Sequence, residues 1–570
     1  MASVTALPRR EKTERPENAK ATGAFYTDAL VAEFLVWWAV RSADDTIIDP
    51  SFGGGVFLRA ACSRLLKLGG QPSDQVFGVE MDREVHAHVA ERLADEFGVP
   101  ERNLVLSDFF RVGHDFAGGV KAIVGNPPYI RYHRFSGEGR KAALECARSQ
   151  GVRLSKLTSS WAPFLVHSVA MLRRGGRLAM VLPMEIGHAS YARPVLDFLS
   201  RSFARVALLT FQEKLFADLS EDTLLLLAEG KDEEPVGFFW RDFAHAGMLL
   251  ELQDREQRRI RGVRRVDPQG LSDGTSRLVE CFIPPRARDL YRSLKQLDLT
   301  LRLGDTADVG IGYVTGANGF YHLTDDAARH WGIPDAFLRP AVRRGRSLAG
   351  LRFTREDWHN ALRSGEAAFL LLIEAEESVL PDSVLRYLHH GRSIGVPKAF
   401  KCRTRSPWYR VPHVYEADAF LTYMSGSCPR LVSNDARVVA PNSLHLVRIH
   451  PLTSFTSHAI AALWQTSLTR LSVEIEGHAL GGGLLKLEPT EAENLLIPAS
   501  RSGNGALMAL ARELDNLIRQ GNDRAARALA DRVLLVDGLG LSVSDCRILR
   551  NAAEQLCQRR YHRKATPNAH

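Results

Sequence analysis

The sequence predicts an α/β protein in which a doubly wound domain is followed by a mixed α/β domain and then by C-terminal helices. In the first half, strand-like and helix-like segments alternate, which is typical of a mainly parallel sheet covered by helices on both faces. After about residue 267 this alternation stops, and short β-type runs are separated by clusters of Gly, Pro, Asn and Asp. From Ala506 to Arg560 the apolar residues return to a helical period.

The strands expected in the first half are short apolar runs: Thr46–Asp49, Val76–Glu80, Leu104–Leu106, Ala122–Val124, Arg177–Leu182, Val206–Phe211 and Thr223–Ala228. Amphipathic helices are expected between them: Ala29–Val40, Val56–Leu68, Glu84–Phe97, Ser159–Leu172 and Ala192–Phe203. We expect Gly175-Gly176 to stop the fourth helix. The Arg-rich range Leu249–Val266 is expected to be a helix or a linker that leads out of the domain.

The length of 570 residues permits two to four folding units at about 150 residues each. We place the boundaries as follows: a flexible N-terminus over 1–20, the doubly wound domain over 21–245, the mixed α/β domain over 246–500, and a helical extension over 501–570. The hydrophobic content of 45% and charged content of 25% are ordinary for a globular protein with a full core.

Membrane insertion, disulfide bonding and zinc binding are all disfavoured by the sequence. No apolar run approaches the roughly 18 residues that a membrane span needs, and residues 1–20 are polar rather than signal-like. The seven cysteines are odd in number and show no CxxC spacing. This usage favours a reducing cytoplasm and gives no support to a metal or disulfide framework.

The charge is distributed unevenly along the chain, although the net charge of +8 is modest. Residues 1–250 carry 30 Lys and Arg against 31 Asp and Glu, whereas residues 251–570 carry 44 against 35. A neutral first half and a basic second half indicate chemistry in the first domain and contact with a polyanion in the second. An uneven solvated surface is the alternative explanation.

Asn126-Pro127-Pro128-Tyr129, at the end of the apolar run from Ala122 to Gly125, is the motif most closely tied to a specific chemistry. The Asn126 side-chain oxygen and the Pro127 carbonyl are two acceptors that can hold both protons of an amine attached to an aromatic ring. Holding these protons frees the nitrogen lone pair, and the Tyr129 ring offers a face for a base to stack on. A rigid Pro-Pro turn after a strand is the structural alternative.

Asp49-Pro-Ser-Phe-Gly-Gly-Gly-Val-Phe57 follows the first expected strand and opens a helix. A Gly-rich turn at this place lets a ligand approach the backbone N–H groups of a helix N-terminus. The motif is not the dinucleotide fingerprint, because Leu58 occupies the third glycine position of GxGxxG. Asp49 instead suits a cationic ligand that carries an amino acid.

Two further acidic residues close the next two strands. Glu80 ends the second, where a carboxylate can bind both hydroxyls of a ribose. Asp108 follows the third, where it can accept from an adenine amine while Phe109 flanks the ring. Each acid alone is more often a loop residue or a helix cap, but such sites at successive strand ends are an improbable coincidence.

Taken together, these motifs resemble those of the gamma-class DNA adenine-N6 methyltransferases, a family in which the Rossmann-like methyltransferase domain precedes a target-recognition domain. Asp49 to Phe57 matches the family pattern DPxxGxGxF, and Asn126 to Tyr129 matches its catalytic tetrapeptide. The resemblance implies S-adenosylmethionine as cofactor, no metal, and catalytic roles for Asn126, Pro127 and Tyr129. It implies a cofactor site formed by Thr22, Tyr26, Thr27, Asp49, Ser51, Gly53, Gly55, Glu80, Asp108 and Phe109.

The resemblance extends past the catalytic tetrapeptide. Phe216 resembles the family residue that packs against a flipped target base together with Tyr129, and Phe211 is the alternative for this role. In the second half, the segments Gly312–Gly316, Ala440–Ser443 and Gly481–Lys486 resemble recognition-domain segments. Asp28 departs from the family, which usually has Pro after the Thr, and is expected to cap the helix that starts at Ala29.

Contacts to DNA are expected from one cationic and aromatic segment of the second domain, on a strand or loop that follows phosphates. Its candidate contact residues are Lys398, Lys401, Arg403, Arg405 and Arg410. A solvated edge strand is an equally good explanation of this segment. The expected partner is duplex DNA, with a separately encoded restriction endonuclease or defence-system subunits as further partners of a monomeric chain. We expect no fused nuclease, because only about 20 residues precede Thr22.

Related activities remain as alternatives. Methylation at C5 of cytosine normally requires a Pro-Cys dipeptide, which this sequence lacks. An enzyme with the same tetrapeptide can act on RNA or on a protein glutamine, although such enzymes are usually compact and lack a large basic half. A non-catalytic DNA-binding subunit that retains the fold is the other alternative, and the intact residues Asp49, Glu80, Asp108 and Asn126 argue against it.

Overall fold

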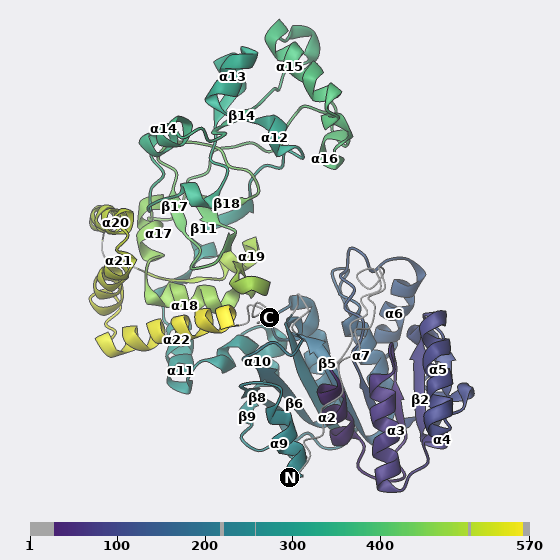
Figure 1. Cartoon of the computed structure of the whole chain (residues 1–570). Coiled ribbons are helices and arrows are strands. Elements are labelled where there is room, and N and C mark those ends of the chain that lie inside the picture. Colours follow the sequence, from purple (N-terminus) through teal and green to yellow (C-terminus); the bar gives the residue numbers. More distant parts are fainter. Residues whose placement is uncertain (1–27, 217–221, 257, 500–502, 563–570) are drawn as a thin grey trace, which may run out of the picture. The chain divides into compact units, whose positions relative to one another are not determined.

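The computed structural model describes residues 28–216, 222–256, 258–499 and 503–562, in two compact units shown in Figure 1. The first unit runs to Val279 and the second begins at Glu280. The predicted cofactor residues Thr22, Tyr26 and Thr27 lie outside the described residues.

The first unit is built on one sheet, which contains nine strands among the described residues, in the order β3-β2-β1-β4-β5-β7-β6-β8-β9. Strands β1 to β5 are parallel, and β7 is inserted antiparallel between β5 and β6. Their bounds are β1 Ile47–Asp49, β2 Val76–Glu80, β3 Leu104–Leu106, β4 Val120–Gly125, β5 Leu172–Pro183, β6 Phe203–Phe211, β7 Thr223–Lys231, β8 Gly237–Phe243 and β9 Arg264–Val266. The predicted doubly wound α/β fold is confirmed.

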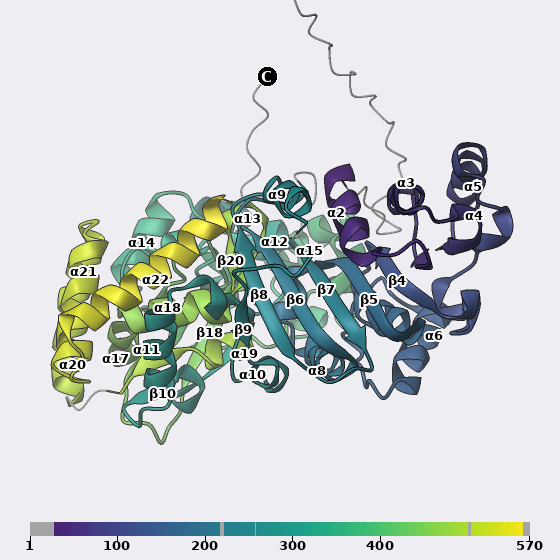
Figure 2. The ribbon, with the colours of Figure 1, turned by 90° about the horizontal axis from the view of Figure 1, so that it is seen from below.

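Helices cover both faces of this sheet: α2, α3 and α9 lie on one face and α8 and α10 on the other (Figure 2). The helices of the unit are α2 Ala29–Ala39, α3 Val56–Leu68, α4 Pro72–Gln75, α5 Arg83–Phe97, α6 Gly137–Ser149, α7 Trp161–Ala170, α8 Arg193–Ser202, α9 Met248–Asp254 and α10 Pro268–Asp273. The core between sheet and helices contains fully buried residues such as Leu35, Leu58 and Leu227. Asp28 caps α2 as expected, because its side chain accepts a hydrogen bond from Leu30 N.

The expectation that Gly175-Gly176 would stop the fourth helix was wrong. Helix α7 ends at Ala170, and both glycines lie inside β5. The pairing of β4 with β5 changes register between Val120 and Ala122, which face Leu172 and Arg177. Gly175 has φ +69°, so a glycine allows the extra residues of this bulge to be accommodated.

The first unit also extends beyond the expected boundary at residue 245. Strand β9 pairs antiparallel with β8, and α10 packs on α8, so both elements belong to the same sheet and its cover. The Arg-rich range expected to be a helix or linker contains most of α9 and the whole of β9. Because β9 and α10 pack on this sheet, the first unit continues to Val279.

The second unit contains several small antiparallel sheets in place of one large sheet. Among the described residues their orders are β10-β21, β11-β18-β15-β17, β12-β14-β13 and β16-β20-β19. The strands are β10 Thr300–Arg302, β11 Ala307–Ile311, β12 His322–Leu323, β13 Leu338–Pro340, β14 Phe369–Leu371, β15 Ala419–Thr422, β16 Met424–Ser425, β17 Leu431–Ser433, β18 Leu444–Ile449, β19 His478–Ala479, β20 Leu485–Lys486 and β21 Leu496–Pro498.

Helices surround these sheets in the second unit. They are α11 Pro285–Lys295, α12 Asn318–Tyr321, α13 Asp325–Trp331, α14 Arg355–Arg363, α15 Asp382–Ser393, α16 Phe400–Arg403, α17 Ser457–Leu463, α18 Ser467–Glu476, α19 Pro489–Glu493, α20 Asn504–Arg519, α21 Asp523–Ala530 and α22 Val543–His562. A π-helical turn over Asp531–Val536 continues from α21. In the described part of the chain, no helix is both long and apolar enough to span a bilayer.

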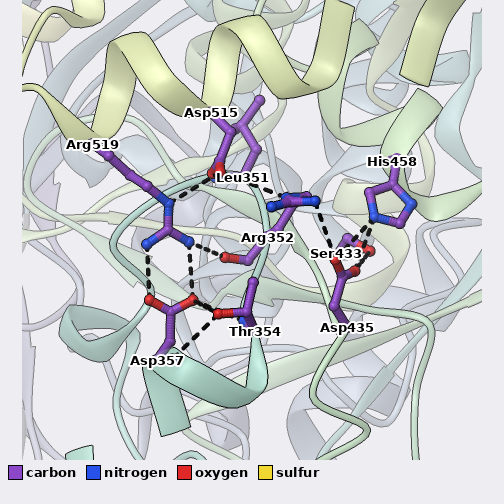
Figure 3. A network of polar contacts seen from close by, with 9 residues as sticks. All are labelled: Leu351, Arg352, Thr354, Asp357, Ser433, Asp435, His458, Asp515 and Arg519. Atoms are coloured by element: carbon purple, nitrogen blue, oxygen red, sulfur yellow. Dashed lines mark hydrogen bonds and ion pairs between the residues drawn. The ribbon is translucent and has the colours of Figure 1, made fainter. Parts of the chain in front are cut away.

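The C-terminal helices are fixed to the rest of the second unit by a polar network (Figure 3). From α20, Asp515 Oδ1 accepts a hydrogen bond from Leu351 N at 2.7 Å. Arg519 donates to both carboxylate oxygens of Asp357 at 2.8 and 2.9 Å, and to the Arg352 carbonyl at 2.7 Å. At the other end of the unit, α22 is joined to α18 by the buried ion pair of Arg560 with Glu474, at 2.7 Å. The C-terminal helices thus form part of the unit's framework.

Candidate active site

The four motifs predicted to carry chemistry meet at one edge of the first sheet. Asp49 ends β1, Glu80 ends β2, Asp108 follows β3 and Asn126 follows β4. These strands are parallel neighbours in the order β3-β2-β1-β4. Since carboxyl ends of parallel strands lie on the same edge, the fold brings together residues that the sequence separates by up to 77 positions.

The Gly-rich turn after β1 depends on the missing side chains of its glycines. Gly55 precedes α3 in a left-handed conformation with φ +75°. A Cβ atom at Gly55 would lie 2.7 Å from Val89 Cγ1, so a larger residue does not fit. Gly53 donates its N–H to Glu80 Oε2 at 3.0 Å and so ties the turn to the end of β2. The half-buried Ser51 also belongs to this turn.

Asp49 is a completely buried carboxyl group that lacks half of its hydrogen bonds. Its Oδ1 accepts from Ser51 N at 3.1 Å, whereas Oδ2 has no hydrogen-bond partner among the described residues. Burial, together with the nearby charge of Glu80, raises the pKa of Asp49 from 3.8 to about 8. A buried oxygen of this kind is costly unless a ligand satisfies it, so the geometry favours a cationic donor at this place.

Glu80 is oriented by backbone groups on two sides. Its Oε1 accepts hydrogen bonds from Met81 N at 2.8 Å and Asp82 N at 2.9 Å, and Oε2 accepts from Gly53 N. A carboxylate held by three N–H groups stays in one rotamer and still has lone pairs for a ligand hydroxyl. This geometry is compatible with the predicted contact to a ribose.

Asp108 and Phe109 differ in how much of the side chain a ligand can reach. Asp108 is half-buried, and its Oδ1 accepts from Phe110 N at 3.1 Å. Phe109 is only 4% exposed, and its ring centroid lies 4.6 Å from both Phe164 and His167 of α7. Burial and the neighbouring His114 lower the pKa of His167 to about 4, so the imidazole behind Phe109 is uncharged at neutral pH. The predicted contact of Phe109 with a ligand would use a small part of the ring.

The predicted catalytic tetrapeptide, Asn126 to Tyr129, is held by contacts that sequence reasoning did not anticipate. The Tyr129 hydroxyl lies 2.6 Å from Asn126 Oδ1, to which it donates, and 3.1 Å from the Val181 carbonyl of β5. Ser160, before α7, donates to the Pro128 carbonyl and accepts from Ile130 N at 2.8 Å. Tyr129 is 8% exposed. It therefore orients the Asn126 amide, a role not included in the predicted stacking on a base.

The two candidate stacking residues lie in different surroundings. Phe211 is 1% exposed in β6, with its ring 5.7 Å from the ring of Phe243, and this burial argues against the alternative assignment of base stacking to Phe211. Phe216 is 9% exposed and packs against the same core. Since the residues after it, 217–221, lie outside the described ranges, the stacking role of Phe216 stays a prediction.

The basic segment of the second unit separates into exposed and engaged cations. Lys398 to Arg403 form a short turn and the helix α16, whereas Arg405 and Arg410 lie in the loop that follows, so the expected strand is absent from this segment and the expected loop holds for its second part. Lys398, Lys401 and Arg403 are exposed. Arg405 donates to the Thr315 carbonyl at 2.8 Å and also to the Val314 carbonyl. Arg410 donates to the Glu374 carbonyl at 2.8 Å. Arg405 and Arg410, both predicted to contact DNA, thus donate hydrogen bonds to backbone carbonyls within their own unit.

Two of the three recognition-like segments pack directly against each other. Tyr313 forms an isolated parallel bridge with Pro441, and Asn442 N donates to the Tyr313 carbonyl at 3.0 Å. A Cβ atom at Gly312 would lie 2.3 Å from the Ala440 carbonyl oxygen, so this close approach requires glycine. Within the described ranges, no group of three or more His, Cys, Asp or Glu side chains is arranged to hold a metal ion.

Comparison with protein families gives one match in each unit. Residues 13–189 match the N-6 DNA methylase family, and residues 275–535 match the C-terminal domain of the Type II methyltransferase M.Eco57I. The second match begins close to the unit boundary at Val279.

Curated relatives cover most of the chain. The Type II methyltransferase M.AccI of Acinetobacter calcoaceticus is 23% identical over 485 residues, which are 83% of this chain and 85% of that protein. The Type II methyltransferase M.XamI of Xanthomonas campestris pv. amaranthicola is 24% identical over 495 residues, 84% and 86% of the two chains.

Solved structures share the fold at low sequence identity. The Type IIL restriction-modification enzyme MmeI in complex with DNA is 12% identical, with a TM-score of 0.55, over 95% of this chain and 75% of that chain. The DrdV–DNA complex is 14% identical, with a TM-score of 0.52, over 88% of this chain and 58% of that chain.

Proposed function

From the premise that this chain is a DNA adenine-N6 methyltransferase of the restriction-modification kind, we propose that it methylates the N6 amine of a flipped adenine in a specific duplex sequence. The observation that carries the proposal is the meeting of Asp49, Glu80, Asp108 and Asn126 at one sheet edge. Neither a turn nor a cap explains all four positions.

S-adenosylmethionine is the cofactor that these residues fit. The buried Asp49 oxygen that has no partner among the described residues suits the α-ammonium group. Glu80 is held ready for the ribose hydroxyls, and Asp108 follows β3 where an adenine amine would need an acceptor. When bound, this cofactor supplies an electrophilic methyl group, so the protein needs no covalent nucleophile of its own.

The chain's own contribution to transfer is to position the target amine. Asn126 Oδ1 has two lone pairs, and one of them accepts from the Tyr129 hydroxyl. The same oxygen and the Pro127 carbonyl are the two acceptors that we assign to the protons of the N6 amine. A preorganised polar group of this type acts on charge that develops during transfer and costs no reorganisation. Because an N6 amine is inaccessible inside a duplex, the base has to leave the stack.

Duplex DNA is proposed to contact the second unit through exposed cations, of which Lys398, Lys401 and Arg403 are the candidates. The excess of basic residues after position 250 supports this division of labour. The names of the Type II relatives further support a separately encoded restriction endonuclease with the same recognition sequence as the biological partner.

The test is methyl transfer by the full chain to genomic duplex DNA, RNA and a protein extract, followed by mapping of modified adenines. We expect N6-methyladenine in one short sequence of duplex DNA, and strongly reduced transfer by an Asn126→Ala variant that still binds S-adenosylmethionine. Transfer to RNA or to glutamine would favour the alternative substrates. Absent cofactor binding by the wild type would favour a non-catalytic subunit.

A further inference from the structure

A second, strongly basic cleft lies in the first unit, at the sheet edge opposite the strand ends of the candidate active site. Lys121 is the second residue of β4, whereas Asn126 follows the end of the same strand five residues later. At about 3.3 Å per residue, the two edges are roughly 16 Å apart along this strand. The cleft has a volume of 530 Å³ and includes Arg177 of β5 and Arg205 of β6 in its lining.

Six cations line this cleft, against two carboxylates: Arg41, Lys121, Arg177, Arg205, Arg258 and Arg259 against Glu229 and Glu233. Three cations have a nearby acid. Arg41 pairs with Glu229 at 2.8 Å and Arg177 with Asp45 at 2.6 Å. The third cation, Lys121, has Glu233 as its nearby acid, because the side chains of both residues reach the same glycine, Gly175.

The other three cations, Arg205, Arg258 and Arg259, have no carboxylate within ion-pair distance in the described part of the chain. Because three guanidinium groups remain unpaired around one cleft, the feature differs from an ordinary exposed surface, where the two signs of charge are interspersed.

Aromatic rings hold two of these guanidinium groups in place. The Arg205 guanidinium lies 3.7 Å from the centre of the Phe239 ring, and that of Arg258 lies 5.5 Å from the Trp37 ring. Trp38 Nε1 also donates to the Arg258 carbonyl at 3.0 Å. The cations are therefore preorganised by uncharged groups, which leaves their charge available to a ligand.

Two electrostatic features show that this arrangement is costly without an anion. Burial and the neighbouring Arg259 lower the pKa of Arg205, and burial with Arg41 lowers that of Arg258. Arg177 is 6% exposed, and its Nε has no hydrogen-bond partner among the described residues. A bound anion would offset the repulsion between these cations.

We propose that this basic cleft binds a small oligophosphate anion through Arg205, Arg258 and Arg259. A guanidinium group presents paired donors that match phosphate oxygens, and several such groups suit a ligand with adjacent phosphates. A neighbouring pocket of 720 Å³ shares the three arginines and adds Phe239, Ile260 and Val263, which leaves apolar room for a nucleoside ring.

A small anion is favoured over duplex DNA because of where the cleft lies. A duplex that places its target base at Asn126 would have to bend around the first unit to reach the opposite sheet edge. DNA has a persistence length of about 150 base pairs, so a bend of that sharpness over so short a distance is expensive. The proposal is also independent of methyl transfer, since the cleft contains none of the candidate active-site residues.

The test is calorimetric titration of the full chain with pyrophosphate and with ATP at about 0.15 M salt, where exposed charges are screened. We expect both anions to bind the wild type. Arg259→Gln, at an exposed position, and the double variant Arg205→Gln/Arg259→Gln should lower affinity by roughly tenfold or more per guanidinium lost. The matched control Arg102→Gln removes one exposed charge next to β3, far along the sheet, and should leave affinity unchanged.

Three results would overturn the proposal. The first is no binding of pyrophosphate or ATP to the wild type up to millimolar concentration. The second is an equal loss of affinity in Arg102→Gln, which would indicate a general charge effect. The third is displacement of pyrophosphate by a short duplex without a target site, which would assign the cleft to DNA. Thermal unfolding of each variant, with S-adenosylmethionine affinity, checks that the first unit remains folded.

Discussion

Binding of S-adenosylmethionine is expected to release a proton at neutral pH, because of the Asp49 carboxyl. Burial raises the pKa of Asp49 to about 8, so the carboxyl is mostly protonated in the free protein at pH 6.5. The cofactor's α-amino group, with an ordinary pKa of about 7.7–8.0, is then protonated as well. Pairing the two as carboxylate and ammonium expels one proton. Above pH 8 the amino group of the free cofactor and the free Asp49 carboxyl are both deprotonated, so binding takes up one proton. Cofactor affinity should therefore be highest near pH 8.

The same shift sets a pH dependence of stability for the free protein. Between pH 4 and pH 8 the folded chain holds the Asp49 proton and the unfolded chain does not. The stability contribution of this group therefore falls as pH rises through that window and is constant above it. The Asp49 pKa differs by about four units between the folded and unfolded chain, which corresponds to a loss of at most roughly 5 kcal/mol in the free energy of unfolding. Asp49→Asn removes this loss, so the variant should be more stable than the wild type at pH 8.5 while binding the cofactor on the order of 10- to 100-fold more weakly.

Two measurements check the reasoning. Calorimetric titration at pH 6.5, in buffers with different ionisation enthalpies, gives the number of protons released; urea unfolding at pH 5 and pH 8.5 gives the stability change. Asp44→Asn, at an exposed position just before β1, is the matched control and should change neither quantity. A binding heat that does not depend on the buffer, or an Asp49→Asn variant with unchanged cofactor affinity, would refute the role of Asp49.

Three further predictions concern transfer and DNA contact. Asn126→Ala should lower the single-turnover rate by about a hundred- to thousandfold with cofactor affinity intact; near-normal turnover would exclude the proposed role. Tyr129→Phe should cost roughly tenfold or less, because it removes the hydroxyl contacts to Asn126 and to the Val181 carbonyl but keeps the Asn126 amide; an equal loss in both variants would contradict this. Neutralising Lys401 or Arg403 should reduce the logarithmic salt dependence of DNA binding by about 0.9 each. Arg405→Gln should instead lower the melting temperature of the second unit, since the Arg405 guanidinium donates to the Val314 and Thr315 carbonyls. An unchanged melting temperature would argue against that structural role.

The sheet of the first unit was predictable because its signals are local. The expected bounds of β2, β3 and α3 agree with the structure, since apolar runs and helical periodicity over Val76–Glu80, Leu104–Leu106 and Val56–Leu68 directly encode these elements. Helix α6 was missed because it presents so little apolar surface. Only Ala143 and Ala147 of Gly137–Ser149 are buried, and glycines stand in its first turn.

The second unit resisted prediction because its strands depend on distant partners. Strand β10 pairs Thr300 with Pro498, almost 200 positions away, and strands such as β16 are two residues long. A run so short has no period of its own. Packing against neighbouring strands determines whether such a run forms a strand, just as it determines the bulge at Gly175.

In the candidate site, the identity of the acids could be predicted, but the Tyr129 contact with Asn126 and the support from Ser160 could not. These depend on where β5 and the start of α7 place Val181 and Ser160. The three cofactor residues before Asp28 lie outside the described part of the chain, so their roles stay predictions.

The polar network that holds α20 and the ion pair that holds α22 impose an order on the folding of the two units during synthesis at the ribosome. Residues up to Val279 emerge first and contain every described strand of the first unit's sheet. The second unit must wait for β21, for the Asp515 and Arg519 contacts of α20, and for Arg560 of α22. Domains generally fold as they are made. A nascent chain would therefore complete the sheet of the first unit before the second unit could fold, so any contact made by the second unit becomes possible only after the first unit is in place.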